Sequence, residues 1–241
     1  MVSGDASAGH AALPGGVGVS GLCVYDWPAA DGLRGGTPHV HLACSEAYVV
    51  TGGRGAVQTL TASGYAVTAL TPGTVAWFTP GTIHRLINDG DLRITVLMQN
   101  SGLPEAGDAV LTLPPRFLTD PETYAAATAI PAGAPEEERE RAARARRDLA
   151  LEGYRALREA DGAEALAAFH RAAAALVRPR IAEWRERWRQ GALRAAETTG
   201  DHLDRLARGD ASHLAGAAVH AEPPAERGRF GMCGRLDVYR G

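Results

Sequence analysis

Three histidines and one glutamate stand at spacings that suit a metal site. His39 and His41 are separated by one residue in the segment TPHVHLACSE, and Glu46 follows His41 after four residues. On a strand, side chains two residues apart point to the same face, so both imidazoles can project together. His84 follows a Pro-Gly turn in a later segment. Three imidazoles and a carboxylate suit a first-row divalent metal such as Fe, Mn, Ni or Zn, with positions left open for water or substrate.

Three further polar residues are candidates for work beside such a metal. Strand parity places Tyr48 on the same face as Glu46, where its phenol could donate a proton or orient substrate; equally, its ring could simply fill the interior. Arg93 and Gln99 share one face of a later run and could bind substrate, although that face could also be solvent, which we favour for Arg93. The candidate catalytic residue is therefore Tyr48, and the candidate substrate-binding residues are Gln99 and Arg93.

Short apolar runs in the first half of the chain must position these residues. The runs are rich in Val and Thr, and Gly, Pro and Asn turn sequences separate them. Many short strands with no helical pattern between them favour an antiparallel sandwich or barrel. The expected strands are residues 21–25, 39–42, 47–51, 56–61, 65–70, 74–78, 84–87 and 92–99.

The second half of the chain has the residue pattern of helices. We expect a helix over residues 136–160, followed by apolar positions at helical spacing from Leu166 to Val177. Pro179 would kink or restart the helix, and Gly191 would end it. The tail could form a late strand. These patterns divide the chain into a flexible N-terminal segment 1–18, a β-barrel 19–118, a linker 119–135 and a helical C-terminal region 136–241.

The two ligand-bearing segments together resemble the two motifs of the cupin superfamily. The first motif is matched by the two histidines, Glu46 and Gly53, with its leading glycine displaced by one position to Gly32. The second is matched by Gly73, Gly81, His84 and Asn88, with Thr79 where the family has proline. The resemblance covers roughly residues 20–100. It implies a double-stranded β-barrel (jelly roll) in which His39, His41, Glu46 and His84 hold one divalent metal ion. It also favours a homodimer, because cupin-like proteins are commonly dimers.

Composition excludes several classes of function. The 241 residues carry a net charge of −3, and the charge-dense stretch 136–148 mixes both signs, so a nucleic-acid partner is not expected. The three cysteines are far apart and include no CxxC pair, which favours a reducing compartment. No apolar run has the length of a signal peptide or membrane helix, so we expect a cytoplasmic protein with no membrane partner.

These observations predict a metal-dependent enzyme that acts on a small oxygen-bearing metabolite. With iron the reaction would be of dioxygenase type, an oxidoreductase, whereas manganese, nickel or zinc would suit isomerisation of a sugar-like compound. The alternative is a non-catalytic barrel that binds a metabolite as a sensor, with the helical region reporting to a partner. An enzyme needs an open metal position and a nearby proton-transfer group, and a sensor needs neither.

Overall fold

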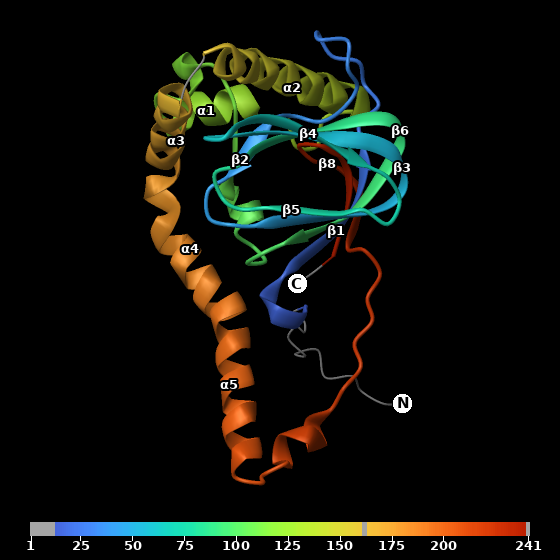
Figure 1. Ribbon diagram of the computed structural model, residues 1–241, viewed down its shortest axis with the longest axis vertical. Coiled ribbons are helices and arrows are strands. Elements are labelled where there is room, and N and C mark those ends of the chain that lie inside the picture. Colours follow the sequence, from blue (N-terminus) through green and yellow to red (C-terminus); the bar gives the residue numbers. More distant parts are fainter. Residues whose placement is uncertain (1–12, 161–162, 240–241) are drawn as a thin grey trace.

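A nine-stranded antiparallel sheet curls into a barrel, and helices cover one side of it (Figure 1). The computed structural model describes residues 13–160 and 163–239, so most of the predicted N-terminal segment 1–18 lies outside the described residues. The main strand order is β4-β3-β6-β1-β9-β8, while β2 and β5 pair with β6 and β3, and β7 pairs with β2. The predicted fold class, a jelly-roll barrel with a helical C-terminal region, is confirmed. The strands are β1 Gly18–Val24, β2 His39–His41, β3 Glu46–Thr61, β4 Gly64–Leu70, β5 Val75–Phe78, β6 Ile83–Met98, β7 Ala109–Leu111, β8 Glu226–Phe230 and β9 Gly234–Val238.

Two long strands, β3 and β6, replace the four short strands expected there. They pair along their whole length, with register shifts between Val50 and Gly55. Gly53 has a φ of 68°, and a Cβ on it would lie 2.1 Å from the carbonyl oxygen of Asp91. Asn88 holds the partner strand, because its side chain accepts from the amides of Gly90 and Leu92. The glycines therefore mark a bulge at which the pair bends, not a turn between separate strands.

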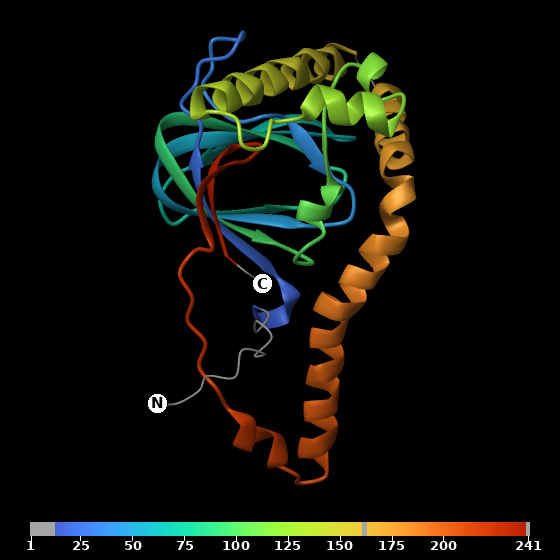
Figure 2. The ribbon, with the colours of Figure 1, turned by 180° about the vertical axis from the view of Figure 1, so that it is seen from behind.

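Helix α2 lies across the barrel. Its contact is close: a Cβ on Gly153 would lie 2.2 Å from the carbonyl oxygen of Thr112. The hydroxyl of Thr112 donates to the carbonyl of Ala150 at 2.9 Å. Figure 2 shows the same helix over the barrel from behind. The α-helices are α1 Pro121–Thr128, α2 Glu136–Glu159, α3 Ala163–Val177, α4 Ile181–Trp188 and α5 Arg194–Ala207.

Helices α3, α4 and α5 run down the side of the barrel and beyond it (Figures 1 and 2). The predicted apolar positions of α3 are buried, and Trp184 of α4 donates to the carbonyl of Ala106 at 3.1 Å. A 3-10 turn at Arg178–Arg180 accommodates Pro179. The predicted helix end at Gly191 is wrong, because a π-helical turn at Arg189–Leu193 connects α4 directly to α5. Of the helices described, none is both long enough and apolar enough to cross a lipid bilayer.

The structure adds two details to the predicted segments. Helix α1 lies within the stretch assigned as a linker, where Asp120 caps its first turn by accepting from the amide of Thr123. The C-terminal region ends in strands, as the tail pattern suggested: it returns to the barrel as the hairpin β8–β9. Strand β9 pairs with β1, so the barrel sheet is completed by residues more than 200 positions apart in the chain.

Candidate metal centre

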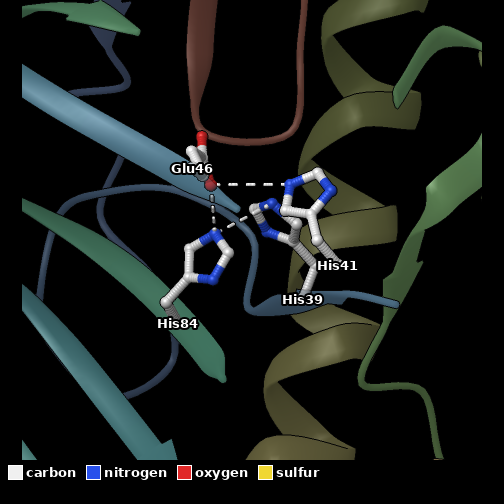
Figure 3. Close-up of side chains that lie close together, drawn as sticks. All are labelled: His39, His41, Glu46 and His84. Carbon is white, nitrogen blue, oxygen red and sulfur yellow. Dashed lines mark hydrogen bonds and ion pairs between the residues drawn. The ribbon is translucent and has the colours of Figure 1, made fainter. Parts of the chain in front are cut away.

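The four predicted ligands converge inside the barrel. His39 and His41 project from β2, Glu46 begins β3, and His84 lies near the start of β6. Strand pairing sets His39 directly opposite His84. One ligand atom from each of the four residues lies within 4.8 Å of all the others, and all four side chains are buried. Figure 3 shows the three imidazoles and the carboxylate pointing toward one centre.

Each imidazole is oriented by a hydrogen bond from its outer nitrogen. Nδ1 of His39 donates to the carbonyl of Thr37 at 2.9 Å, and Nδ1 of His84 donates to the carbonyl of Thr82 at 3.1 Å. Nδ1 of His41 lies 2.9 Å from Oδ2 of Asp108. Carbonyls and carboxylates only accept, so Nδ1 carries a proton in all three rings. The Nε2 atoms are thereby left facing the centre, as in histidines that bind metals.

The inward atoms form a cluster that attracts positive charge. Nε2 of His39 and Nε2 of His84 are 3.1 Å apart, and Oε2 of Glu46 lies 3.1 Å from the latter nitrogen. The same carboxylate oxygen lies 3.5 Å from Nε2 of His41. Two imidazole lone pairs at this separation repel each other, whereas a cation between them and the carboxylate removes the repulsion. The donor set and its geometry therefore fit a divalent metal ion.

Burial and neighbouring charge shift the pKa values of the cluster in opposite directions. Burial, followed by the adjacent imidazoles of His84 and His41, holds the pKa of His39 well below its usual range. Burial also disfavours a charged His41, but the carboxylates of Asp108 and Glu46 outweigh it and raise its pKa to about 9. Burial opposes ionisation of Glu46, yet the imidazoles of His84 and His41 lower its pKa overall. Glu46 is therefore an anion in a buried site, which a bound cation would stabilise.

Asp108 is a functional residue that the sequence patterns missed. It is fully buried, and its Oδ1 accepts from the amides of Leu42 and Ala43 at 3.1 and 2.6 Å. Those bonds fix the turn between β2 and β3, while Oδ2 holds His41. No motif contains Asp108, which lies more than sixty residues from His41. The only available signal was an acidic residue just before a short apolar run.

A cavity of about 340 Å³ opens beside the cluster. His39, His41 and Glu46 form part of its wall, together with residues of β1, β6, α2 and the β8–β9 hairpin. The hairpin turn is fixed against the barrel, because the amide of Thr37 donates to the carbonyl of Met232 at 2.9 Å. The hydroxyl of Tyr25 donates to the carbonyl of Gly231 at 3.0 Å. Figure 3 shows this hairpin passing next to Glu46. The C-terminal tail therefore contributes directly to the cavity.

Tyr48 lies on the face of β3 predicted for it, but it is not among the residues that line the cavity. Its ring packs edge-on against Phe78 with centroids 5.3 Å apart, and its hydroxyl has no hydrogen-bond partner within the described part of the chain. Burial, reinforced by the charge of Glu46, raises its pKa well above the usual range, so the phenol stays protonated. Its catalytic role remains a prediction.

Neither Arg93 nor Gln99 lines this cavity, so a role for them in substrate binding remains a prediction. Arg93 is exposed on β6, and Gln99 is exposed just past the end of this strand, where it accepts from the amide of Ser45 at 3.1 Å. The cavity wall is formed instead by the alternate residues Val96 and Met98. Strand parity placed the two polar residues together correctly, but it did not say which face of the strand was inside.

No protein-family model matches the chain, and no curated protein is similar to it. Among solved structures, the capsular polysaccharide assembling protein CapF from Staphylococcus aureus is 18% identical over 38% of this chain and 25% of its own, with a TM-score of 0.31. A protein with a double-stranded β-helix domain from Klebsiella pneumoniae is 23% identical over 36% of this chain and 69% of its own, with a TM-score of 0.26. A cupin protein from Bacteroides fragilis is 18% identical over 36% and 65%, also with a TM-score of 0.26. The chain thus spans a quarter of the length of CapF.

The resemblance to cupins that the two motifs indicated is confirmed in this chain's own barrel. The first motif supplies β2 and the start of β3, and the second supplies the turn before β6. Although these segments are some forty residues apart, they meet with all four ligand side chains directed at one point.

Proposed function

We propose that this protein, which has the barrel and the histidine–glutamate ligand set of the cupins, is a metal-dependent enzyme acting on a small metabolite. One observation carries the proposal. A buried cluster of three imidazoles and one carboxylate lies beside a cavity large enough for a small molecule, and His39, His41 and Glu46 form part of the wall of that cavity. A metal bound there would supply Lewis-acid or redox chemistry to a ligand in the cavity. His39, His41, Glu46 and His84 would hold that metal.

The composition of the cavity wall favours an oxidoreductase of dioxygenase type over a sugar isomerase. Most of the wall is apolar, including Val19, Leu22, Val96, Met98 and Phe230. A sugar needs polar partners for its hydroxyl groups, because unpaired polar groups are costly to bury. A substrate with an apolar body suits this wall better. We therefore propose iron as the metal and dioxygen as the co-substrate.

The chain's own residues would act by orienting and enclosing the substrate. Asp108 and the carbonyls of Thr37 and Thr82 keep the three Nε2 atoms directed inward. The β8–β9 turn covers the cavity beside the cluster and limits the access of water. Tyr48, which stays protonated and whose ring centroid lies 6.3 Å from that of His84, would be a phenolic proton donor beside the cluster.

The proposal is tested by reconstituting the protein anaerobically with Fe(II) and measuring bound metal by mass spectrometry. We expect about one equivalent per chain, and its loss in His84→Ala. His220→Ala is the matched control, because His220 is exposed and distant from the cluster in sequence. Equal metal content in the two variants would refute the four-ligand site. Dioxygen uptake with a panel of small acids then tests turnover: metal binding without uptake would favour the non-catalytic sensor.

A further inference from the structure

We infer that the substrate is a small carboxylic acid with an apolar body, and that Arg146 binds its carboxylate. This inference rests on the proposed function, because it names the class of ligand for the same cavity. It starts from an arginine that forms no ion pair with a carboxylate in the described part of the chain.

Arg146 lies on α2 and lines the cavity together with the metal cluster. One Nη2–H donates to the carbonyl of Gly231 in the hairpin turn at 2.7 Å. Its Nε is buried and has no hydrogen-bond partner among the residues that the structure describes. Within residues 13–160 and 163–239, no carboxylate forms an ion pair with it, and burial lowers its pKa. A guanidinium of this kind lacks the anion that a partly buried arginine normally has.

Two other arginines show what a structural role looks like in this fold. Arg85 is fully buried and pairs with Asp31 through both terminal nitrogens. Arg147, the next residue along α2, donates to the carbonyls of Trp27 and Pro28 and to the carboxylate of Asp148. Each of them has a carboxylate partner, although Nε of Arg85, like Nε of Arg146, has no hydrogen-bond partner among the described residues. Arg146 has one backbone acceptor, no carboxylate partner among the described residues, and a place in the cavity wall.

The rest of the cavity wall indicates the chemistry of the part of the ligand that is not the carboxylate. The wall to which Arg146 belongs is mainly apolar, with Val19, Leu22, Val96 and Leu236 among its members, and its carboxylates are those of Glu46 and Glu105. Arg229 is at the same cavity and is paired only loosely with Glu226, at 3.7 Å. A planar carboxylate matches the two-pronged donor geometry of a guanidinium, and an apolar body matches the aliphatic wall. A carboxylic acid satisfies both features together.

The test uses phenylacetate and its uncharged isostere phenylacetamide as probes, with binding measured by calorimetry. On the wild-type protein, phenylacetate should bind at least about tenfold more tightly than the amide. Arg146→Gln should weaken phenylacetate binding by about the same factor and leave the amide unaffected. Arg141→Gln is the matched control, since it removes an exposed arginine from the same helix, and it should bind both probes as the wild type does.

Each probe is titrated into both metal-loaded and metal-free protein, so that the two proposals can fail separately. Absence of bound metal would refute the metal centre, while the Arg146-dependent preference for phenylacetate could still be scored. Equal binding of the two probes to the wild type, or an unchanged phenylacetate affinity in Arg146→Gln, would overturn the inference. Should Arg146→Gln melt at a lower temperature than the wild type, Arg146→Lys keeps the charge and should retain part of the preference.

Discussion

At the scale of single residues, the centre depends on which nitrogen of each imidazole faces inward. The outer partners decide this, and they differ in kind. His39 and His84 each donate to the carbonyl two residues before them, a backbone partner that requires no particular side chain. His41 instead depends on Asp108, which a mutation can change. Asp108 is therefore the position at which the orientation of a ligand can be tested without removing the ligand.

We predict that Asp108→Asn lowers metal affinity by about 10- to 100-fold. The amides of Leu42 and Ala43 both donate to Oδ1, so the asparagine oxygen will remain there and its NH₂ will face Nδ1 of His41. His41 must then accept at Nδ1 and carry its proton on Nε2, where it cannot bind a metal. Competition with a metal-binding dye measures the affinity. Asp89→Asn, an exposed acid-to-amide change, should leave it unchanged; an equal effect of both would contradict the prediction.

The ligands were predictable because their signal is local. Histidines two residues apart must share a face of a strand, and a motif spacing places Glu46 beside them. Asp108 and Arg146 were not predictable, since each acts through a neighbour that only the folded chain provides. Arg146 is further hidden in a charge-dense run that mixes both signs. Arg147, the next residue, is buried. In this run, therefore, the position of a residue on the helix decides its burial more than the composition of the run does.

At the scale of elements, glycines were the residues most easily misread. Gly52-Gly53 and the Asn-Asp-Gly stretch at residues 88–90 look like hairpin turns in the sequence. In the structure they face each other across a bulge in one continuous strand pair. The same residues suit both arrangements, because both need a positive φ and close backbone approach. Only the pairing partner distinguishes them, and a single sequence does not contain that information.

Gly153 provides a test of how closely α2 approaches the barrel. Alanine is normally favoured over glycine in a helix by about 1 kcal/mol. A Cβ at this position, however, would be 2.2 Å from a backbone oxygen that cannot rotate away. We predict that Gly153→Ala lowers the free energy of unfolding by about 1–3 kcal/mol, as overpacking does. Urea unfolding followed by circular dichroism measures the change.

Gly200→Ala is the matched control for this prediction. Gly200 lies inside α5, and a Cβ there would have no atom within 4 Å. The substitution should therefore be neutral or stabilising by up to about 1 kcal/mol. Stabilisation by both substitutions would mean that α2 can move away from the barrel at little cost.

At the scale of the whole molecule, the helical rod of α4 and α5 extends past the barrel (Figures 1 and 2). None of the residues of α5 is buried, and Leu203 and Leu206 are 62% and 51% exposed. A helix of 14 residues is marginal in water without tertiary packing. The sequence-based expectation of a homodimer therefore acquires a candidate surface, and we propose that a second copy of the chain covers this face of α5.

The prediction is that the wild-type protein has twice the mass of its 25.2 kDa chain in light scattering, and that Leu203→Glu combined with Leu206→Glu reduces it to one chain. Burying two glutamates against an apolar partner costs far more than the interface gains from the remaining contacts. Arg205→Glu is a control with the same change of net charge, on the opposite side of the helix and also exposed, and it should remain dimeric. A wild-type mass of one chain, or dimers in the double variant, would place any second copy elsewhere. Metal content should be the same in all three proteins, because the four ligands lie within one barrel and α5 contributes none of them.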